Sequence, residues 1–203
     1  MSVAPSKTMT PLVLFVCSGN ICRSPLAELL FRTRTAELGR LIRVASAGTS
    51  ALVGSQPPDE IIDLAMSYGG GVLTHQGTQI TPALAVSADL ILTATRQHSN
   101  DIVRSVVGAS RKTFTLLQFA RLLDSFIVLP RASDSSRSPM TFRRLVSEVA
   151  DLRGHVPLPD YPDDDDIADP YRESIATYDL VGAAIDEATR FIASGIDQVL
   201  DDH

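Results

Sequence analysis

The stretch that most constrains the fold is an unbroken apolar run that leads into a turn and then a helix. Residues 12–16 read LVLFV, and Cys17 follows at once. An apolar run without polar alternation is typical of a strand buried on both faces, as in the centre of a parallel sheet. Residues 24–38 then predict a helix, with Ser24 as its N-cap and Gly39 just after its end. The sequence therefore predicts a strand–turn–helix unit here.

The alternation of strand and helix continues through the first half of the chain. Short apolar, β-rich runs alternate with segments that carry helix start and end signals. This pattern predicts an α/β three-layer sandwich with a four-stranded parallel sheet, of the flavodoxin-like or Rossmann-like type. The remaining predicted strands are 42–48, 88–95 and 112–116, and the remaining predicted helices of this half are 57–69 and 96–108.

The second half of the chain is less regular. We expect residues 1–10 to form a flexible tail and residues 11–203 to form a single domain. Within that domain, the segment 117–165 is interpreted as an extended insertion. Helices are predicted at 117–126, 140–154 and 174–200, with a Ser/Pro-rich loop at 129–139 and a Pro/Asp-rich loop at 155–171.

Charge and composition exclude several classes of protein. The chain has 203 residues, with 18 Lys and Arg against 24 Asp and Glu, for a net charge of −6. No basic cluster is present to neutralise nucleic-acid phosphates or an anionic membrane, so neither partner is expected. The first residues do not read as a signal peptide, and the run at 12–16 is too short to span a bilayer. A cytoplasmic location is therefore expected, where cysteines are more often reactive or buried than joined in a disulfide.

The turn after the first predicted strand has the composition of an anion-binding loop. It follows the carboxyl end of a parallel strand, where α/β proteins bind ligands. Gly19 and Asn20 tolerate the left-handed conformations that aim successive N–H groups at one point, and the next helix adds its positive end. Arg23 supplies a guanidinium that matches two phosphate oxygens. A thiolate at Cys17 would be an activated nucleophile, placed where a phosphorus atom would arrive.

The residues VCSGNICRSP, at 16–25, resemble the C-x5-R-[ST] phosphate loop of cysteine-dependent phosphatases. More narrowly, they resemble the start of the low-molecular-weight protein tyrosine phosphatase family, and the resemblance covers 11–116 and again 166–200. It implies hydrolysis of phosphotyrosine through a phosphocysteine intermediate, with Cys17 as nucleophile and Arg23 on the transferring group. It also implies a phosphate-binding loop made of Ser18, Gly19, Asn20, Ile21, Cys22, Arg23 and Ser24.

The resemblance also assigns a general acid and a set of supporting residues. The family's acid is the aspartate of an Asp-Pro pair in a late loop, and this chain has DIADPY at 166–171. Asp169 would protonate the leaving oxygen and then, as a carboxylate, activate the water that hydrolyses the phosphocysteine. Pro170 favours an extended backbone at Asp169. The residues that the resemblance implies hold the phosphate loop in shape are Asn20, Ser24, Ser46 and His75.

The second cysteine has two readings. Cys22 is either a redox partner that forms a reversible disulfide with Cys17, as the resemblance implies, or a small buried side chain. No metal or other cofactor is expected, because the two cysteines lack partner Cys or His pairs. The histidines that carry no recognisable pattern are His98, His155 and His203.

Several residues bear on the substrate, again by resemblance. Leu52 and Tyr171 would form the walls of the substrate slot, with Tyr171 stacked on the substrate ring. Arg172 would attract acidic peptides, whereas the run Asp163–Asp166 is interpreted as a solvated loop. Ile21 is typical of the tyrosine phosphatases, since relatives that act on phosphoarginine have Thr at this position. The expected partner is a phosphotyrosine-containing protein, for example a bacterial tyrosine autokinase, and phosphate and vanadate are expected site ligands.

Two other functions remain open at this point. The first is an arsenate reductase on the same scaffold. The thioredoxin-coupled type needs a third cysteine and the chain has 2, whereas a glutathione-coupled type with fewer cysteines stays open. The second is a phosphate-binding or redox-sensing module without catalysis. A module that only binds phosphate has no need of an acid, so Asp169 favours the phosphatase.

Overall fold

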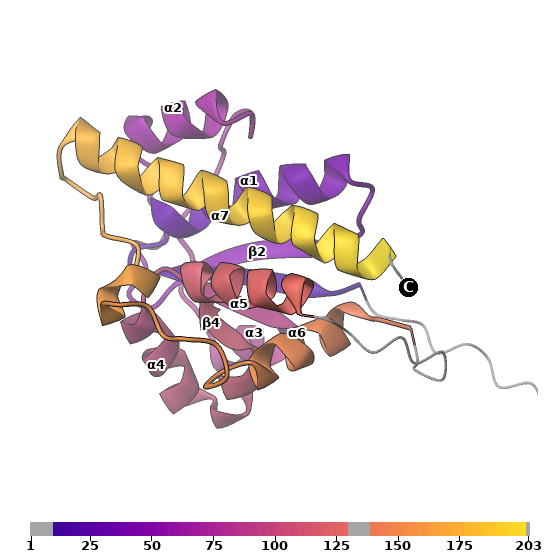
Figure 1. Cartoon of the computed structure of the whole chain (residues 1–203). Helices are drawn as coiled ribbons and strands as arrows, with labels where there is room; N and C mark the ends of the chain where they lie inside the picture. The colour runs from indigo at the N-terminus through magenta and orange to yellow at the C-terminus, as the bar shows by residue number, and fades with distance from the viewer. Residues whose placement is uncertain (1–9, 130–138, 202–203) are drawn as a thin grey trace, which may run out of the picture.

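The apolar run at residue 12 forms the central strand of the sheet. The computed structural model describes residues 10–129 and 139–201 (Figure 1), so the expected tail lies outside the described residues apart from residue 10. The strands are β1 Leu12–Cys17, β2 Arg43–Gly48, β3 Leu90–Thr93 and β4 Thr113–Thr115. They are all parallel and lie in the order β2-β1-β3-β4, so β1 has a partner on each side.

Side chains of β1 alternate between two hydrophobic cores, one on each face of the sheet. Val13 and Phe15 belong to the larger core, whereas Leu14 and Val16 belong to the smaller one. All four side chains are buried. A strand with no solvated face needs apolar residues at every position, which is why this run shows no polar alternation.

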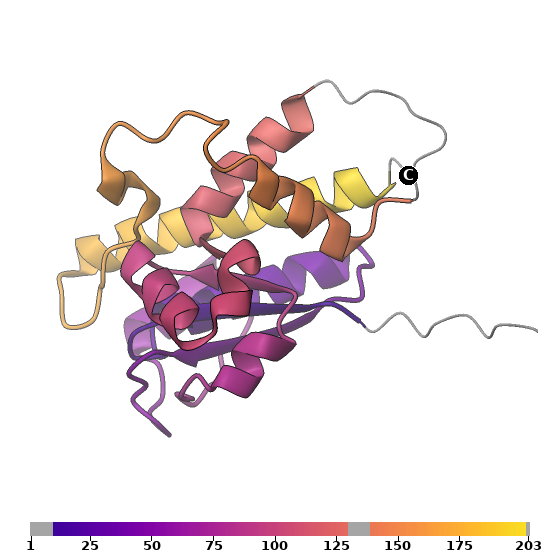
Figure 2. The ribbon, with the colours of Figure 1, turned by 90° about the horizontal axis from the view of Figure 1, so that it is seen from below.

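Helices cover both faces of the sheet (Figures 1 and 2). The predicted α/β three-layer sandwich with a four-stranded parallel sheet is therefore confirmed. Three short elements were not predicted, α3 (Pro82–Ser87) and the 3-10 helices η1 (Val107–Lys112) and η2 (Pro162–Asp165), because four to six residues hold too few turns to show a periodic pattern. The larger core receives side chains from α1 Arg23–Glu37, α2 Asp59–Ser67, α5 Leu116–Val128, α6 Phe142–Asp151 and α7 Ile175–Asp201, and the smaller from α3 Pro82–Ser87, α4 Arg96–Ser105 and η1 Val107–Lys112.

Threonines start two helices directly at the ends of strands. Thr95, just after β3, accepts a hydrogen bond from the His98 backbone N–H at the start of α4. Thr115, the last residue of β4, accepts one from the Gln118 N–H at the start of α5 at 3.1 Å. Such caps satisfy N–H groups that have no partner within the helix. The carboxyl edge of the sheet is therefore built from short, well-fixed connections.

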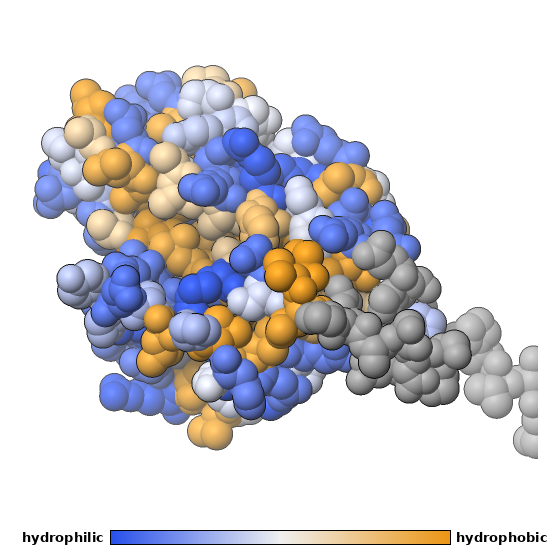
Figure 3. All heavy atoms as spheres, viewed as in Figure 1, coloured by the Kyte–Doolittle hydropathy of each residue, from blue (hydrophilic) through white to orange (hydrophobic). Residues whose placement is uncertain are grey.

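The segment 117–165 supplies most of α5, all of α6 and the 3-10 helix η2, Pro162–Asp165. α5 packs against α7, and a hollow of about 1040 Å³ lies beside them, with Leu117, Ala120 and Phe191 among its lining residues. Figure 3 shows apolar side chains gathered between these two helices. The predicted loop 155–171 contains η2, and residues 130–138 of the other predicted loop lie outside the described part of the chain. The interpretation of 117–165 as an insertion in a single domain stays a prediction.

The last helix is held along α1 by a largely buried ion pair. Arg34 on α1 pairs with the Asp186 carboxylate on α7 and donates to the Asp186 carbonyl oxygen at 2.8 Å. The Arg34 and Asp186 side chains are only 12% and 9% exposed, so loss of Asp186 would leave the Arg34 charge uncompensated in the interface, whereas Asp186 has a second partner in Arg190. None of the helices in the two described ranges is long and apolar enough to cross a membrane.

We expect Gly48→Ala to destabilise the fold at the carboxyl edge of the sheet. A Cβ at Gly48 would lie 2.3 Å from the Ser18 carbonyl oxygen and 3.0 Å from Ala51 Cα, and both are backbone atoms that cannot move aside cheaply. Overpacking of this kind costs about 1–3 kcal/mol in the free energy of unfolding, measured by urea titration. Gly108→Ala is the matched control, since a Cβ there meets nothing within 4 Å. Equal stability of the two variants would contradict the expectation.

Candidate active site

The turn predicted to bind phosphate lies between β1 and α1 at the carboxyl edge of the sheet. β1 ends at Cys17 and α1 begins at Arg23. The turn is held from outside by the chain that follows β2, because Ser50 N donates to the Ser18 carbonyl oxygen at 3.0 Å and Leu52 N donates to that of Gly19 at 3.0 Å. Backbone pairing to a neighbouring segment thus fixes the rim of the turn.

Asn20 holds the interior of the turn. It has a φ of 55° and is completely buried. Its side-chain amide donates to Ser24 Oγ at 2.8 Å and to Ser46 Oγ at 2.9 Å. Its Oδ1 accepts from Thr78 N at 2.8 Å and from His75 Nε2 at 3.2 Å, and its carbonyl oxygen lies 2.9 Å from the same ring nitrogen. The structure thus brings together Asn20, Ser24, Ser46 and His75, the set expected to support the loop.

The Ser24 hydroxyl lies 3.0 Å from Cys17 Sγ. Because Ser24 Oγ accepts from the Asn20 amide, its own proton can be donated to the sulfur or to the Ala47 carbonyl oxygen, which lies 3.4 Å away. The prediction that Ser24 is the N-cap of α1 is wrong. Ser24 lies inside the helix, Cys22 holds the N-cap position without a side-chain hydrogen bond, and the hydroxyl is used in the loop instead.

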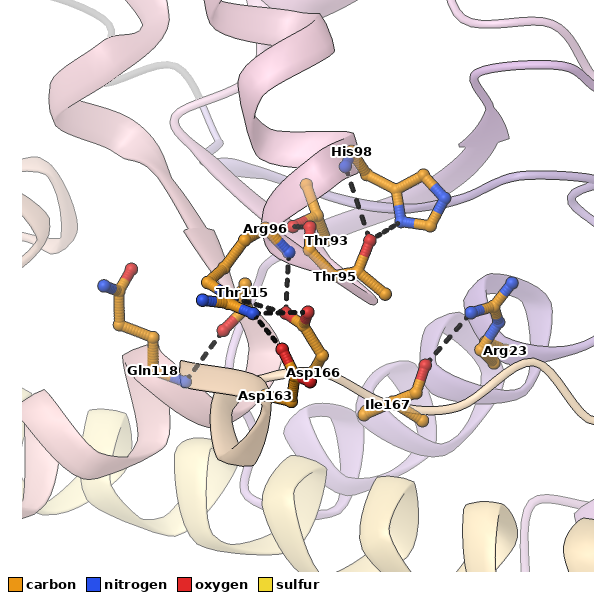
Figure 4. A network of polar contacts seen from close by, with 10 residues as sticks. All are labelled: Arg23, Thr93, Thr95, Arg96, His98, Thr115, Gln118, Asp163, Asp166 and Ile167. Atoms are coloured by element: carbon orange, nitrogen blue, oxygen red, sulfur yellow. Dashed lines mark hydrogen bonds and ion pairs between the residues drawn. The ribbon is translucent and has the colours of Figure 1, made fainter. Parts of the chain in front are cut away.

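Arg23 joins the turn to a segment far along the chain. Its guanidinium is almost completely buried and donates from Nη1 to the Ile167 carbonyl oxygen at 3.0 Å (Figure 4). Its Nη2 lies 2.7 Å from Asp169 Oδ2 and 3.5 Å from Ser18 Oγ. Its Nε is one of two buried side-chain nitrogens or oxygens in the described residues that have no hydrogen-bond partner. A buried donor of this kind has the chemistry to bind an anion.

Cys17, Arg23 and Asp169 line the same pocket, which has a volume of about 230 Å³. At its mouth lie Leu52 and Tyr171, which are 41% and 38% exposed. Most of the expected site residues therefore converge, and Asn20, Ser24, Ser46 and His75 form the network described above. Ser50 was not expected in the lining. The full lining is Cys17, Ser18, Gly19, Ile21, Cys22, Arg23, Ser50, Leu52, Asp169 and Tyr171.

The two cysteines differ in their surroundings, and both are free thiols. Burial raises the pKa of Cys22 to about 12, and the nearby Cys17 and Asp169 add to the effect. The Cys22 thiol is therefore protonated at neutral pH. Its role as a redox partner of Cys17 stays a prediction.

His98, to which no pattern was assigned, touches the phosphate loop. Its Nε2 lies 2.9 Å from Ser18 Oγ and its Nδ1 lies 2.8 Å from Thr95 Oγ1. Burial, and then the positive charge of Arg23, lower the pKa of His98 to about 4, so the imidazole is neutral at neutral pH. The sequence held one signal for this contact. His98 closely follows the predicted strand 88–95, and the phosphate loop follows another strand of the same predicted sheet.

The interpretation of the aspartate run as a solvated loop is wrong for Asp165 and Asp166, whereas Asp163 and Asp164 are exposed. Asp165 is buried and pairs with Arg121 at 2.8 Å. Asp166 accepts a hydrogen bond from the Arg96 backbone N–H at 2.8 Å, and Asp163 pairs with the Arg96 guanidinium (Figure 4). Three of the four carboxylates are thus engaged by arginines.

The described ranges contain no group of three or more His, Cys, Asp or Glu side chains suited to a metal ion.

Comparison with known proteins bears on this site. A family model described as "Low molecular weight phosphotyrosine protein phosphatase" matches residues 12–125, a range that ends before Asp169. A protein-arginine-phosphatase of Bacillus subtilis (strain 168) is 37% identical over 108 residues, which is 53% of this chain and 71% of that protein. The low molecular weight protein-tyrosine-phosphatase Etp of Escherichia coli (strain K12) is 37% identical over 107 residues, or 53% and 70% of the two chains.

Solved structures agree with this comparison. The tyrosine phosphatase Wzb from Escherichia coli K30, in complex with sulphate, matches with a TM-score of 0.64 and 26% identity over 93% of this chain and 99% of that one. The YwlE arginine phosphatase from Geobacillus stearothermophilus matches in fold with a TM-score of 0.67 at 24% identity, over 95% and 97% of the two chains. The expected family and enzyme class are confirmed. Because the family model matches more than half of this chain, the chain belongs to the low molecular weight phosphotyrosine protein phosphatase family.

Proposed function

We propose that this phosphatase hydrolyses phosphotyrosine in proteins through a phosphocysteine at Cys17. The observation that carries the proposal is the meeting of Cys17, Arg23 and Asp169 in one pocket with apolar walls. A nucleophile, a fixed cation and a carboxyl group at one point are the parts that phosphoryl transfer requires.

In the first step, the Cys17 thiolate attacks phosphorus, and the bond from phosphorus to the phenolic oxygen breaks. Asp169 gives its proton to that oxygen, so tyrosine leaves as a neutral phenol. In the second step, the Asp169 carboxylate takes a proton from water, the water oxygen attacks phosphorus, and the sulfur leaves as a thiolate. Inorganic phosphate is released and both residues return to their starting states.

Arg23 and the loop N–H groups would stabilise the transferring group. The unpartnered Nε of Arg23 is a donor that a phosphate oxygen would satisfy. Its Nη2 is paired with Asp169 in this structure, so a phosphate dianion would compete with that carboxylate for the guanidinium. Binding at this loop is expected for phosphate and for vanadate alike.

The walls of the pocket favour an aromatic substrate. Ile21, Leu52 and Tyr171 present apolar surface, and Tyr171 can stack on the phenol ring. Arg172 lies next to this wall, with its guanidinium carbon 5.0 Å from the Tyr171 ring centre, where it would attract acidic residues beside the phosphotyrosine. A phosphoarginine substrate is the second candidate, because one relative at 37% identity is named a protein-arginine-phosphatase. Ile21 supports the first candidate, since relatives that act on phosphoarginine have Thr there.

By resemblance to the bacterial members, the partner would be a phosphotyrosine-containing protein such as a tyrosine autokinase, encountered in the cytoplasm. No metal takes part in the proposed steps, because Asp169 supplies the proton and Arg23 supplies the positive charge. The arsenate reductase stays an alternative only in a glutathione-coupled form.

Substrate assays test the reaction class and the substrate together. We expect the wild type to hydrolyse p-nitrophenyl phosphate and a phosphotyrosine peptide with EDTA present, and Cys17→Ser to hydrolyse neither, because serine in this loop is a far weaker nucleophile. A phosphoarginine peptide should give a lower kcat/KM than the phosphotyrosine peptide. The opposite order would assign the second substrate, and full activity of Cys17→Ser would contradict the phosphocysteine.

Asp169→Ala should lower kcat by ~10²–10⁴-fold, the usual contribution of a general acid or base. Phosphate and vanadate should still inhibit the variant, and at lower concentrations, since the loop and Cys17 are untouched and Arg23 has lost the carboxylate that competes with the anion. The wild-type profile of kcat/KM should be bell-shaped on the acidic side of neutral, and the limb due to the acid should be missing in the variant. Unchanged turnover would remove Asp169 from the mechanism.

Iodoacetate at pH 7 should label Cys17 and spare Cys22. Only thiolates react, and burial raises the pKa of Cys22 to about 12, so its thiol stays protonated. Mass spectrometry should find one carboxymethyl group on the wild type and on Cys22→Ser, and none on Cys17→Ser. Vanadate should protect the thiol. Labelling of Cys22 at a comparable rate would show that its thiol is neither buried nor protonated in solution.

A further inference from the structure

The segment that leads to Asp169 is fixed to the start of α4 by Arg96, which pairs with the carboxylates of Asp163 and Asp166. Asp166 Oδ1 accepts from the Arg96 backbone N–H at 2.8 Å and from Arg96 Nε at 3.3 Å, and its Oδ2 lies 3.2 Å from Nη2 (Figure 4). Arg96 is the first residue of α4, so its N–H is one of those without a partner inside the helix. Asp166 lies 70 residues further along the chain than Arg96. Its carboxylate thus satisfies that helix end and helps to neutralise the Arg96 guanidinium.

The next residue continues this attachment into the active site. Ile167 N donates to the Ala94 carbonyl oxygen at 2.8 Å, just past the end of β3. The Ile167 carbonyl oxygen then accepts from Arg23 Nη1 at 3.0 Å. Asp166 and Ile167 therefore connect the start of α4 to the arginine of the phosphate loop.

Beyond this point the chain is exposed and has few contacts. Residues 168–175 are exposed except for Pro170. Asp169 itself has an exposed fraction of 51% for its side chain, and its contacts are the Arg23 ion pair and a 3.3 Å hydrogen bond from Tyr171 N. An acid on such a stretch takes its position from its nearest anchor, and proton transfer needs the acid within hydrogen-bond reach of the leaving oxygen.

We propose that Arg96 and Asp166 are positioning residues that hold the general acid over the phosphate loop. This inference rests on the proposed function of Asp169. It gives the aspartate run a role in the reaction, although neither residue of the pair lines the pocket. Loss of the pair would displace the proton donor and leave the nucleophile and the phosphate cradle in place.

Leaving groups of different basicity provide the test. p-Nitrophenolate leaves readily without a proton, whereas phenolate, a base like the tyrosine side chain with a pKa of about 10, needs one. The quantity to measure is kcat/KM for p-nitrophenyl phosphate divided by kcat/KM for phenyl phosphate, because kcat/KM covers the step in which the phenol departs. A general loss of stability or of active enzyme lowers both values together and leaves their ratio unchanged.

The variants are Asp166→Ala, Arg96→Gln and Asp169→Ala, with Arg111→Gln as the matched control. Arg111 forms a similar ion pair, 2.7 Å from Asp151, away from the pocket. We expect the ratio to rise about 10-fold in Asp166→Ala, less in Arg96→Gln, which keeps the backbone hydrogen bond, and not at all in the control. Vanadate inhibition should stay within about threefold of wild type in Asp166→Ala, Arg96→Gln and the control, since the cradle is intact, and should be stronger in Asp169→Ala, which frees Arg23.

The double variant of Asp166 and Asp169 completes the test. If the pair acts through the acid, Asp166→Ala should not change the ratio further once Asp169 is alanine. A wild-type ratio in both Asp166→Ala and Arg96→Gln would overturn the inference while leaving the proposed function standing. A wild-type ratio in Asp169→Ala would instead overturn the proposed acid, and the inference with it. Should Asp166→Ala fail to fold, as judged by thermal unfolding, Arg96→Gln decides alone.

Discussion

The carboxyl edge of this sheet depends on one buried side chain, that of Asn20. Asn20 has a φ of 55°, a left-handed backbone that asparagine tolerates better than most residues but that still costs free energy. Hydrogen bonds from its amide group to α1, to β2 and to the chain before α3 offset that cost. If the loop relaxed, the groups bonded to the Asn20 side chain would lose their hydrogen bonds. The phosphate loop and the packing around it are therefore expected to form together.

Much of the fold and the centre of the site can be predicted from the sequence because both are encoded locally. The strand at residues 12–17 and the helix after it are set by a continuous apolar run and by the residues of a single turn. The phosphate loop is likewise one contiguous motif, so Cys17 and Arg23 are found together. Asp169 lies in a separate segment and could be proposed only through the resemblance, which its place in the pocket supports.

Other parts of the site could not be predicted, because they arise from contacts between distant segments. His98 reaches Ser18 across 80 positions, and the sequence signal for the pair is weak, since it is only that His98 closely follows a strand of the predicted sheet. The aspartate run reads as solvated by composition alone, yet arginines on α4 and α5 reverse that environment. Ser24 shows the same limit at short range, since a serine near a helix start has the pattern of a cap whether or not its hydroxyl is used elsewhere.

Arg23 and Ile167 are 144 residues apart in the chain and share one hydrogen bond. The residues that support the loop from Cys17 to Ser24 lie between residues 46 and 98, whereas Asp169 arrives only with the segment that precedes the last helix. On the proposed roles, a chain that is still being synthesised, or one cut in the segment before residue 166, would hold a nucleophile without its acid. A chain that ends there would also lack the α7 side chains of the larger core, so catalytic competence would report that the C-terminal third has been made and has docked.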